Sequence, residues 1–154
     1  MKITLYSFFI ISIAISGCAG SNSIAHQEIK QGISGYIYIE KGNRMPNPGK
    51  QLNSPTGFAT TVFIHPVTEL NQLFPSTTAG LFQMIYTSSI TSITSDSLGY
   101  FSVKLPAGKY SVFVKYEGGF YANWFNEKNQ IAPVEVFENQ VSKVKYTVSA
   151  GATY

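Results

Sequence analysis

The chain has 154 residues, of which 44% are hydrophobic and 12% are charged, and its formal net charge is +3. This length suits a single domain, and the hydrophobic content is sufficient for a real core. The lysines and arginines form no cluster, which excludes the basic surface that nucleic-acid binding requires. The eight acidic residues are scattered singly and the two histidines are far apart, which argues against an enzyme.

The N-terminal segment has the pattern of a secretory signal. It begins with Met1-Lys2, continues with an apolar run at residues 3–15, and ends in small residues before Cys18. A membrane-spanning helix needs about 20 apolar residues, and this run is shorter, so it indicates a cleaved export signal. Residues 15–18, Ile-Ser-Gly-Cys, resemble the lipobox of bacterial lipoproteins, in which the cysteine is acylated after cleavage.

The lipobox resemblance implies an order of segments at the N-terminus. Residues 1–17 would be the signal peptide and Cys18 the lipid attachment site, followed by a flexible polar tether at residues 18–31 in which His26 is exposed and idle. Several acyl chains on Cys18 would hold the protein firmly on the membrane. The resemblance to inner-membrane lipoproteins would require aspartate directly after the cysteine. Residue 19 is alanine instead, which implies the outer membrane of a bacterial envelope. The alternative is an ordinary secretory signal with an incidental cysteine.

A first strand is predicted for residues 32–42, because Ile33, Ile37 and Ile39 alternate with polar or aromatic side chains. Residues 41–58 are rich in glycine, proline and asparagine and predict a long loop.

The next segments contain one further strand, an ambiguous region and a weak strand. Residues 60–65 predict a strand that Pro66 ends, and its His65 is a lone imidazole with a structural role rather than a metal-binding one. We interpret residues 66–89 as an insertion with a short helical turn, and residues 89–94 as a β-branched strand.

The stretch at residues 95–116 contains two alternating runs and two turns. Asp96 can accept backbone hydrogen bonds and Gly99 can adopt a positive φ, so these two residues predict the first turn. Pro106 and Gly108 form the turn between the two runs, which predicts an antiparallel hairpin. No second carboxylate lies near Asp96 in the sequence, which disfavours a catalytic or calcium-binding role.

A group of aromatic residues follows the second run. Exposed rings of this kind would form an apolar platform for a carbohydrate or a peptide, whereas buried rings would close one end of the core. Residues 134–137 and 141–148 predict the last strands, and about seven short strands without a long helix predict an all-β sandwich. The aromatic residues are Tyr116, Phe120, Tyr121, Trp124 and Phe125.

A family resemblance rests on residues 95–101, Ser-Asp-Ser-Leu-Gly-Tyr-Phe, and residues 105–110, Leu-Pro-Ala-Gly-Lys-Tyr. With the glycine-led first strand they resemble the carboxypeptidase regulatory-like domain over residues 32–148. The resemblance implies a transthyretin-like (prealbumin-like), antiparallel Greek-key β-sandwich that serves as a structural module and is not itself a peptidase. The loop at residues 41–58 and the insertion at residues 66–89 depart from the family pattern.

The sequence therefore predicts a non-catalytic envelope lipoprotein without cofactor or metal. The membrane would be contacted through Cys18, and the β-sandwich at residues 32–154 would bind or space other envelope components, with a protein or a glycan as partner. One alternative is a carbohydrate- or peptide-binding module that uses the aromatic group. Another is an assembly or adhesin-type subunit in which an exposed edge strand pairs with a neighbour.

Overall fold

The computed structural model describes residue 26, residues 28–45, residue 49 and residues 54–153. The predicted signal peptide at residues 1–17, the lipid attachment site at Cys18 and most of the predicted tether lie outside the described residues. In the part of the chain that is described, no helix combines the length and apolar character needed to cross a membrane.

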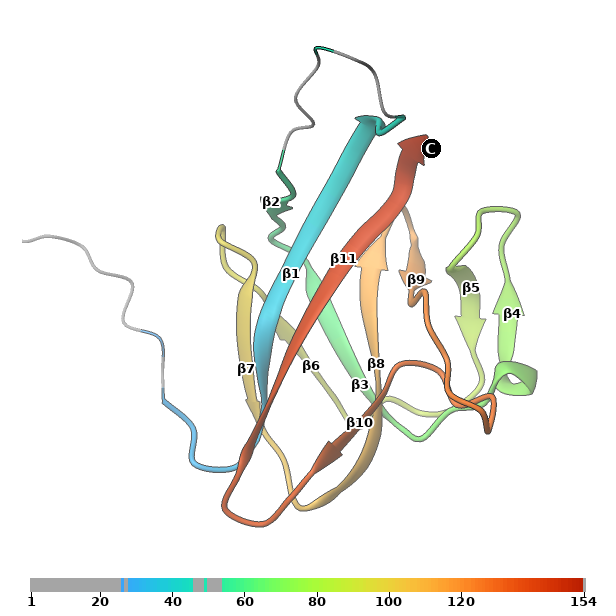
Figure 1. The fold of residues 1–154 in the computed structure, drawn as a ribbon. Helices are drawn as coiled ribbons and strands as arrows, with labels where there is room; N and C mark the ends of the chain where they lie inside the picture. The colour runs from blue at the N-terminus through green and yellow to red at the C-terminus, as the bar shows by residue number, and fades with distance from the viewer. Residues whose placement is uncertain (1–25, 27, 46–48, 50–53, 154) are drawn as a thin grey trace, which may run out of the picture.

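The described residues form two layered β-sheets (Figure 1), which confirms the predicted all-β sandwich. There are more strands than the predicted seven or so because several short segments also pair. In chain order the elements are β1 (Gly32–Asn43), β2 (Thr56–Gly57), β3 (Thr61–Pro66), the 3₁₀ turn η1 (Leu70–Gln72), β4 (Leu73–Pro75), β5 (Leu81–Ile85), β6 (Thr91–Thr94), β7 (Tyr100–Lys104), β8 (Gly108–Tyr116), β9 (Gly119–Tyr121), β10 (Pro133–Val136) and β11 (Val141–Thr153).

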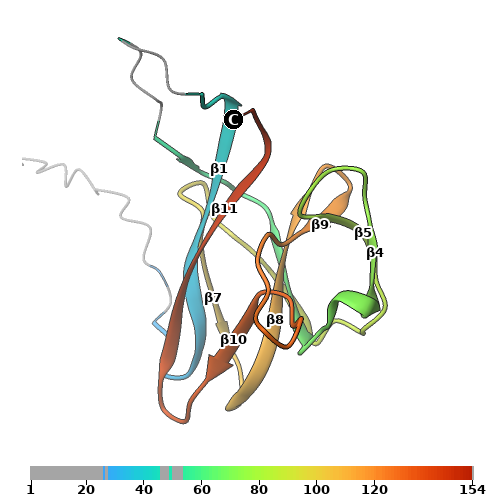
Figure 2. The same cartoon turned by 45° about the vertical axis from the view of Figure 1, so that its right-hand side comes forward.

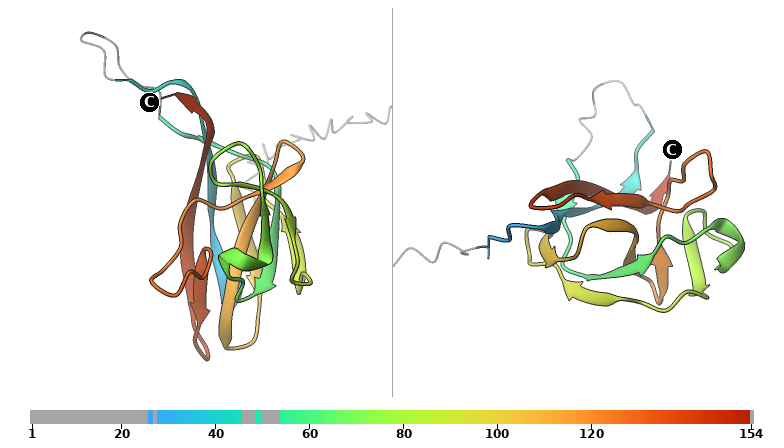
Figure 3. Two further views of the ribbon diagram at one scale, coloured as in Figure 1. Left: turned by 90° about the vertical axis from the view of Figure 1, so that its right-hand side faces the viewer. Right: turned by 90° about the horizontal axis from the view of Figure 1, so that it is seen from below.

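The smaller sheet, sheet A, has the order β11-β1-β2, with β7 also paired to β1. The larger sheet, sheet B, has the order β4-β5-β9-β8-β3-β6, with β10 also paired to β8. Figure 3 shows the two layers edge-on and from below. The core between the layers is built from alternate side chains of both sheets, among them Ile33, Ile37, Phe101 and Val148 of sheet A and Val62, Ile64, Val112 and Val114 of sheet B.

The first strand has the predicted alternation, since Ile33 and Ile37 are fully buried whereas Tyr36 is exposed. However, β1 pairs in parallel with β11, from Gly32 opposite Val141 onward. The prediction of a uniformly antiparallel sandwich is therefore wrong at this pair. The reason is topological: the chain leaves β1, builds most of the sandwich, and returns to start β11 at the same end of sheet A.

The predicted hairpin between the runs of residues 100–105 and 108–116 is also wrong. Strand β7 pairs with β1 in sheet A, whereas β8 pairs with β3, β9 and β10 in sheet B. Both runs bury their apolar sides, Phe101 and Val103 from one layer and Val112 from the other, so they face each other across the core. The link that contains Pro106 and Gly108 therefore connects the two layers.

The insertion at residues 66–89 contains the predicted helical turn as η1, and residues 73–85 form the β4–β5 hairpin. Its last part packs on the outer side of sheet B, where the Thr87 hydroxyl lies 3.0 Å from Nδ1 of His65. Phe113, on the outward side of β8, is fully buried there, and the His65 ring packs edge-on against it. The β4–β5 hairpin thus extends sheet B beyond β9, and the segment after it contacts the outer side of this sheet.

Candidate functional site

A groove of about 500 Å³ opens along one side of the sandwich. Its walls come from the β4–β5 hairpin, from the segment between β9 and β10, and from the last part of β11. Figure 2 shows these elements, with the hairpin and β9 on one side, β11 on the other, and the connecting segment between them. We call this space the Trp124 groove.

Hydrogen bonds fix the segment that carries Trp124 and Phe125. The side-chain oxygen of Asn126 accepts the N–H groups of Lys128 and Gln130 at 3.0 and 3.1 Å. The N–H of Ala132 donates to the carbonyl of Trp124 at 3.0 Å, so the segment closes on itself. The N–H of Leu70 donates to the carbonyl of Asn129, which ties the segment to η1.

The predicted aromatic group is divided by the fold. Tyr116 and Tyr121 are buried in the core, and Phe120 packs edge-on against Phe63 on the outer side of sheet B. Trp124 and Phe125 are exposed, at 42% and 58% of their surface, and both line the Trp124 groove. Two of the five rings are therefore exposed at the groove, which the buried Tyr121 also lines.

The wall of the Trp124 groove is mainly apolar, with Thr78, Asn123 and Ser149 as polar members, and none of the described residues that line it is acidic or basic. Leu70, Phe82 and Ile131 contribute aliphatic and aromatic surface. At the floor, the Tyr121 hydroxyl lies 2.9 Å from Oγ of Ser149 and accepts the Ser149 N–H at 3.2 Å. Such a wall favours an uncharged ligand, because a charged group would lose its hydration without gaining a partner.

A second hollow of about 440 Å³ lies between β10 and β11 and shares Trp124 with the groove. We call it the β10–β11 hollow. One of its lining residues is Tyr146, whose hydroxyl is buried without a hydrogen-bond partner among the described residues. Burial raises the pKa of the Tyr146 hydroxyl well above its ordinary value, so the group stays protonated and able to donate.

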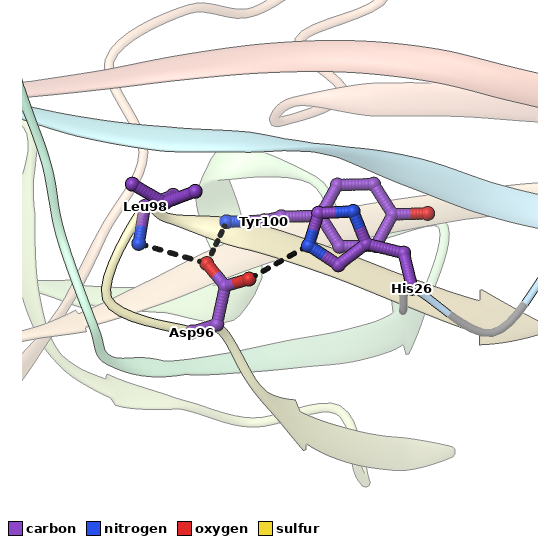
Figure 4. A network of polar contacts seen from close by, with 4 residues as sticks. All are labelled: His26, Asp96, Leu98 and Tyr100. Carbon is purple, nitrogen blue, oxygen red and sulfur yellow. Dashed lines mark hydrogen bonds and ion pairs between the residues drawn. The ribbon is translucent and has the colours of Figure 1, made fainter. Parts of the chain in front are cut away.

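The turn at Asp96 connects β6 of sheet B to β7 of sheet A (Figure 4). One carboxylate oxygen of Asp96 accepts the N–H groups of Leu98 and Tyr100, at 2.9 and 2.8 Å, as predicted for a turn residue. Gly99 adopts φ +83° and its carbonyl accepts the Ile37 N–H of β1. Asp96 therefore stabilises the turn that connects the two sheets.

His26 is exposed, as predicted, but the prediction that it is idle is wrong. Its Nε2 lies 2.8 Å from the second carboxylate oxygen of Asp96, and its ring stacks on Tyr100 at 3.8 Å between centroids (Figure 4). Burial acts to raise the pKa of Asp96, but the hydrogen bonds from His26, Tyr100 and Leu98 outweigh it and lower the pKa. This part of the predicted tether is thus docked on the domain.

His65 has the structural position that the sequence predicts. It is 4% exposed, and burial lowers the pKa of its imidazole despite the opposing hydrogen bond with Thr87. Across the described ranges of the chain, no three histidine, cysteine or acidic residues lie close enough together to hold a metal ion.

Two parts of the wall of the Trp124 groove could not be predicted from the sequence. Ala150 and Ala152 are small residues at the end of β11, and Phe82 belongs to the segment whose structure was ambiguous. Their role depends on which strands lie side by side, and alternation within a single strand does not contain that information.

The chain matches no protein-family model, and it matches none of the curated proteins and none of the solved structures with which it was compared. The fold and the site define an all-β sandwich with an open aromatic groove on one side, and the resemblance to the carboxypeptidase regulatory-like domain stays a prediction.

Proposed function

We propose that this chain is a lipid-anchored envelope protein whose β-sandwich is a non-catalytic binding module, with the Trp124 groove as its binding site. The observation that carries the binding role is the exposure of Trp124 and Phe125 on a hydrogen-bonded segment beside an uncharged wall. Flat apolar surfaces held in a fixed orientation lose little entropy on binding, so they are favourable contact sites.

The non-catalytic part of the proposal is supported by the positions of the two histidines. His65 is buried below the insertion with its Nδ1 occupied by Thr87, and His26 is held by Asp96 and Tyr100. Neither residue lines the Trp124 groove. Hydrolysis of a peptide or glycan by the purified domain that is lost on mutation of His65 would overturn this part.

The membrane part of the proposal rests on the sequence around Cys18. We expect the wild-type chain, made in a bacterium, to fractionate with the membrane and to carry the added mass of acyl chains. Cys18→Ala should abolish both. Acylation is needed for tight anchoring because each buried CH₂ contributes about 0.8 kcal/mol. Release of the wild-type chain into the soluble fraction without added mass would refute the anchor.

The binding role can be tested by the fluorescence of Trp124, the only tryptophan of the chain. Iodide should quench this emission, because the indole is partly exposed. The purified chain is then titrated with uncharged oligosaccharides and with short apolar peptides, and one of these classes should shift the emission and protect it from iodide. A blue-shifted emission that iodide does not quench would remove the basis of the proposal.

A matched pair of variants distinguishes binding in the Trp124 groove from nonspecific binding to exposed apolar side chains. Phe125→Ala removes a ring of the groove that is 58% exposed, whereas Phe137→Ala removes a ring of similar exposure, 51%, outside the groove. We expect the first to weaken binding about tenfold, the equivalent of about 1.4 kcal/mol, and the second to leave it unchanged. An equal effect of the two substitutions would contradict the proposed site.

A further inference from the structure

Strand β11 is an edge strand of sheet A, because β1 is its only pairing partner in the described part of the chain. The Gly32 N–H donates to the carbonyl of Gln140, and the parallel register then advances two residues at a time. The backbone groups of the even-numbered residues of β11 therefore face β1, and those of Lys143, Lys145 and Thr147 face away from it.

These outward backbone groups are unpaired within the described residues. Ser149, the next odd-numbered residue, has its N–H bonded to the Tyr121 hydroxyl, which agrees with the direction derived from the register. For Lys143, Lys145 and Thr147 no backbone hydrogen bond beyond the β1 pairing occurs in the described part of the chain. The edge of β11 thus offers a row of free donors and acceptors to another strand.

The two hollows follow this same edge. The β10–β11 hollow is bordered by residues 142–146 of β11, and the Trp124 groove by Ser149, Ala150 and Ala152. Trp124 borders both and stands between them. A strand added to β11 beside residues 142–147 would therefore have the β10–β11 hollow on its core-facing side, and its end would reach Trp124 and the Trp124 groove.

Polar groups along the edge indicate which side chains would fit. Lys143 and Lys145 are exposed on the outward face of β11, and neither has a carboxylate within ion-pair distance among the described residues. Acidic residues two positions apart on an added strand would lie directly opposite them. On the inner side, Tyr146 lines the β10–β11 hollow, and its hydroxyl is itself buried.

We propose that the ligand is an extended polypeptide segment that adds to the free edge of β11 as a further strand of sheet A. Its apolar side chains enter the β10–β11 hollow and the Trp124 groove, and its acidic side chains lie opposite Lys143 and Lys145. This inference rests on the proposed function, since it names the class of ligand that the groove takes. The backbone of the ligand supplies the affinity and the alternation of its side chains supplies the specificity.

The probe is a capped peptide of alternating valine and glutamate, about eight residues long, which in extended form spans roughly 27 Å. Its matched control has the same side chains but carries N-methyl groups on the amides of one edge, and a second control carries them on the other edge. An added strand pairs through one edge only, so we expect one of the two methylated peptides to bind at least about tenfold more weakly than the parent. Equal binding of all three peptides would overturn the proposal.

Hydrogen exchange of individual amides gives a readout that is independent of the side chains. On peptide binding, the amides of Lys143, Lys145 and Thr147 should exchange at least about tenfold more slowly, because they become hydrogen-bonded. Those of Ser142 and Val144 face β1 already and should change little. Unchanged exchange at Lys143 and Lys145 in the peptide complex would overturn edge pairing.

Charge reversal tests the predicted side-chain order. The double variant Lys143→Glu, Lys145→Glu should bind the valine-glutamate peptide more weakly than the wild-type chain does. It should bind a valine-lysine peptide more tightly, by a similar factor. Lys104→Glu, on the exposed side of β7 at the opposite edge of sheet A, is the control and should affect neither peptide. An equal response of the control variant would show general electrostatic attraction and overturn the assigned orientation.

The outcomes distinguish this inference from the function on which it rests. If an uncharged oligosaccharide protects Trp124 and the peptide does not, the groove is a binding site but its ligand is not a polypeptide strand. If no ligand of either class changes Trp124 fluorescence, the binding role itself fails. If the amides of Lys143 and Lys145 become protected with protein concentration alone, the occupant is a second copy of this chain and the peptide proposal is overturned.

Discussion

Substitution of Gly99 by alanine should lower the free energy of unfolding by more than the cost of the positive φ angle at this position. Gly99 adopts φ +83°, a conformation that costs an L-residue about 1–2 kcal/mol. A Cβ built there would lie 2.0 Å from the carbonyl oxygen of Ile37 and 3.1 Å from the backbone nitrogen of Phe58. Because both neighbours are backbone atoms of paired segments, relief requires movement of β1 relative to the turn, and overpacking of this kind costs about 1–3 kcal/mol more.

Gly118 provides a matched control for that prediction. It adopts φ +80°, nearly the same angle, but a Cβ at Gly118 would meet no atom within 4 Å. Gly118→Ala should therefore cost about 1–2 kcal/mol, the conformational part alone, and Gly99→Ala should cost about 2 kcal/mol more. The measurement is guanidinium unfolding followed by circular dichroism, with the change read from the midpoint at constant slope. Equal losses in the two variants would refute the steric part of the reasoning.

Three further predictions concern the Asp96 turn, the buried histidine and the insertion. Asp96→Ala should lower the free energy of unfolding by about 1 kcal/mol, the size of a lost hydrogen bond, and an unchanged thermal midpoint would contradict it. The pKa of His65 is lowered from 6.5 by burial, so below that pH the unfolded chain takes up a proton that the folded chain excludes. Stability should consequently fall from pH 7 to pH 5, and the fall should be shallower in His65→Gln. Phe113→Ala should cost about 3–5 kcal/mol because Phe113 is fully buried, whereas Phe74→Ala, at a half-exposed ring, should cost far less in the same unfolding assay.

The fold class could be predicted from local patterns because each main strand carries its own alternation. Ile33 and Ile37 in β1, Phe101 and Val103 in β7, and Val112 in β8 are all buried as their positions in the alternation require. Alternation decides which side of a strand is apolar, so it is sufficient to predict a layered β structure.

Strand pairing could not be predicted in the same way. The turn residues Pro106 and Gly108 are compatible with a hairpin and equally with a link between layers, because both require only a reversal of the chain. The link between layers forms because β7 pairs with β1, and this pairing is a long-range contact. The parallel pairing of β1 with β11 is a long-range contact as well.

The candidate site was predictable only in part, for a related reason. Trp124 and Phe125 stood out as aromatic residues, but Tyr116 and Tyr121, equally aromatic, are in the core. The difference arises because the latter two lie in β8 and β9 with their rings toward the core, whereas the former two lie in the segment after β9. The contact of His26 with Asp96 joins residues that no local pattern connects.

The parallel pairing of β1 with β11 also constrains the order in which the molecule can form during synthesis. Strand β1 is made early, yet the side of it that faces away from β7 gains its partner only when residues 141–153 have been made. Until then its backbone groups on that side are open to any other extended chain, and Tyr146 and Val148 are missing from the core. Such a domain completes sheet A only when β11 has docked, so the free side of β1 stays open to other extended chains until this last step of folding.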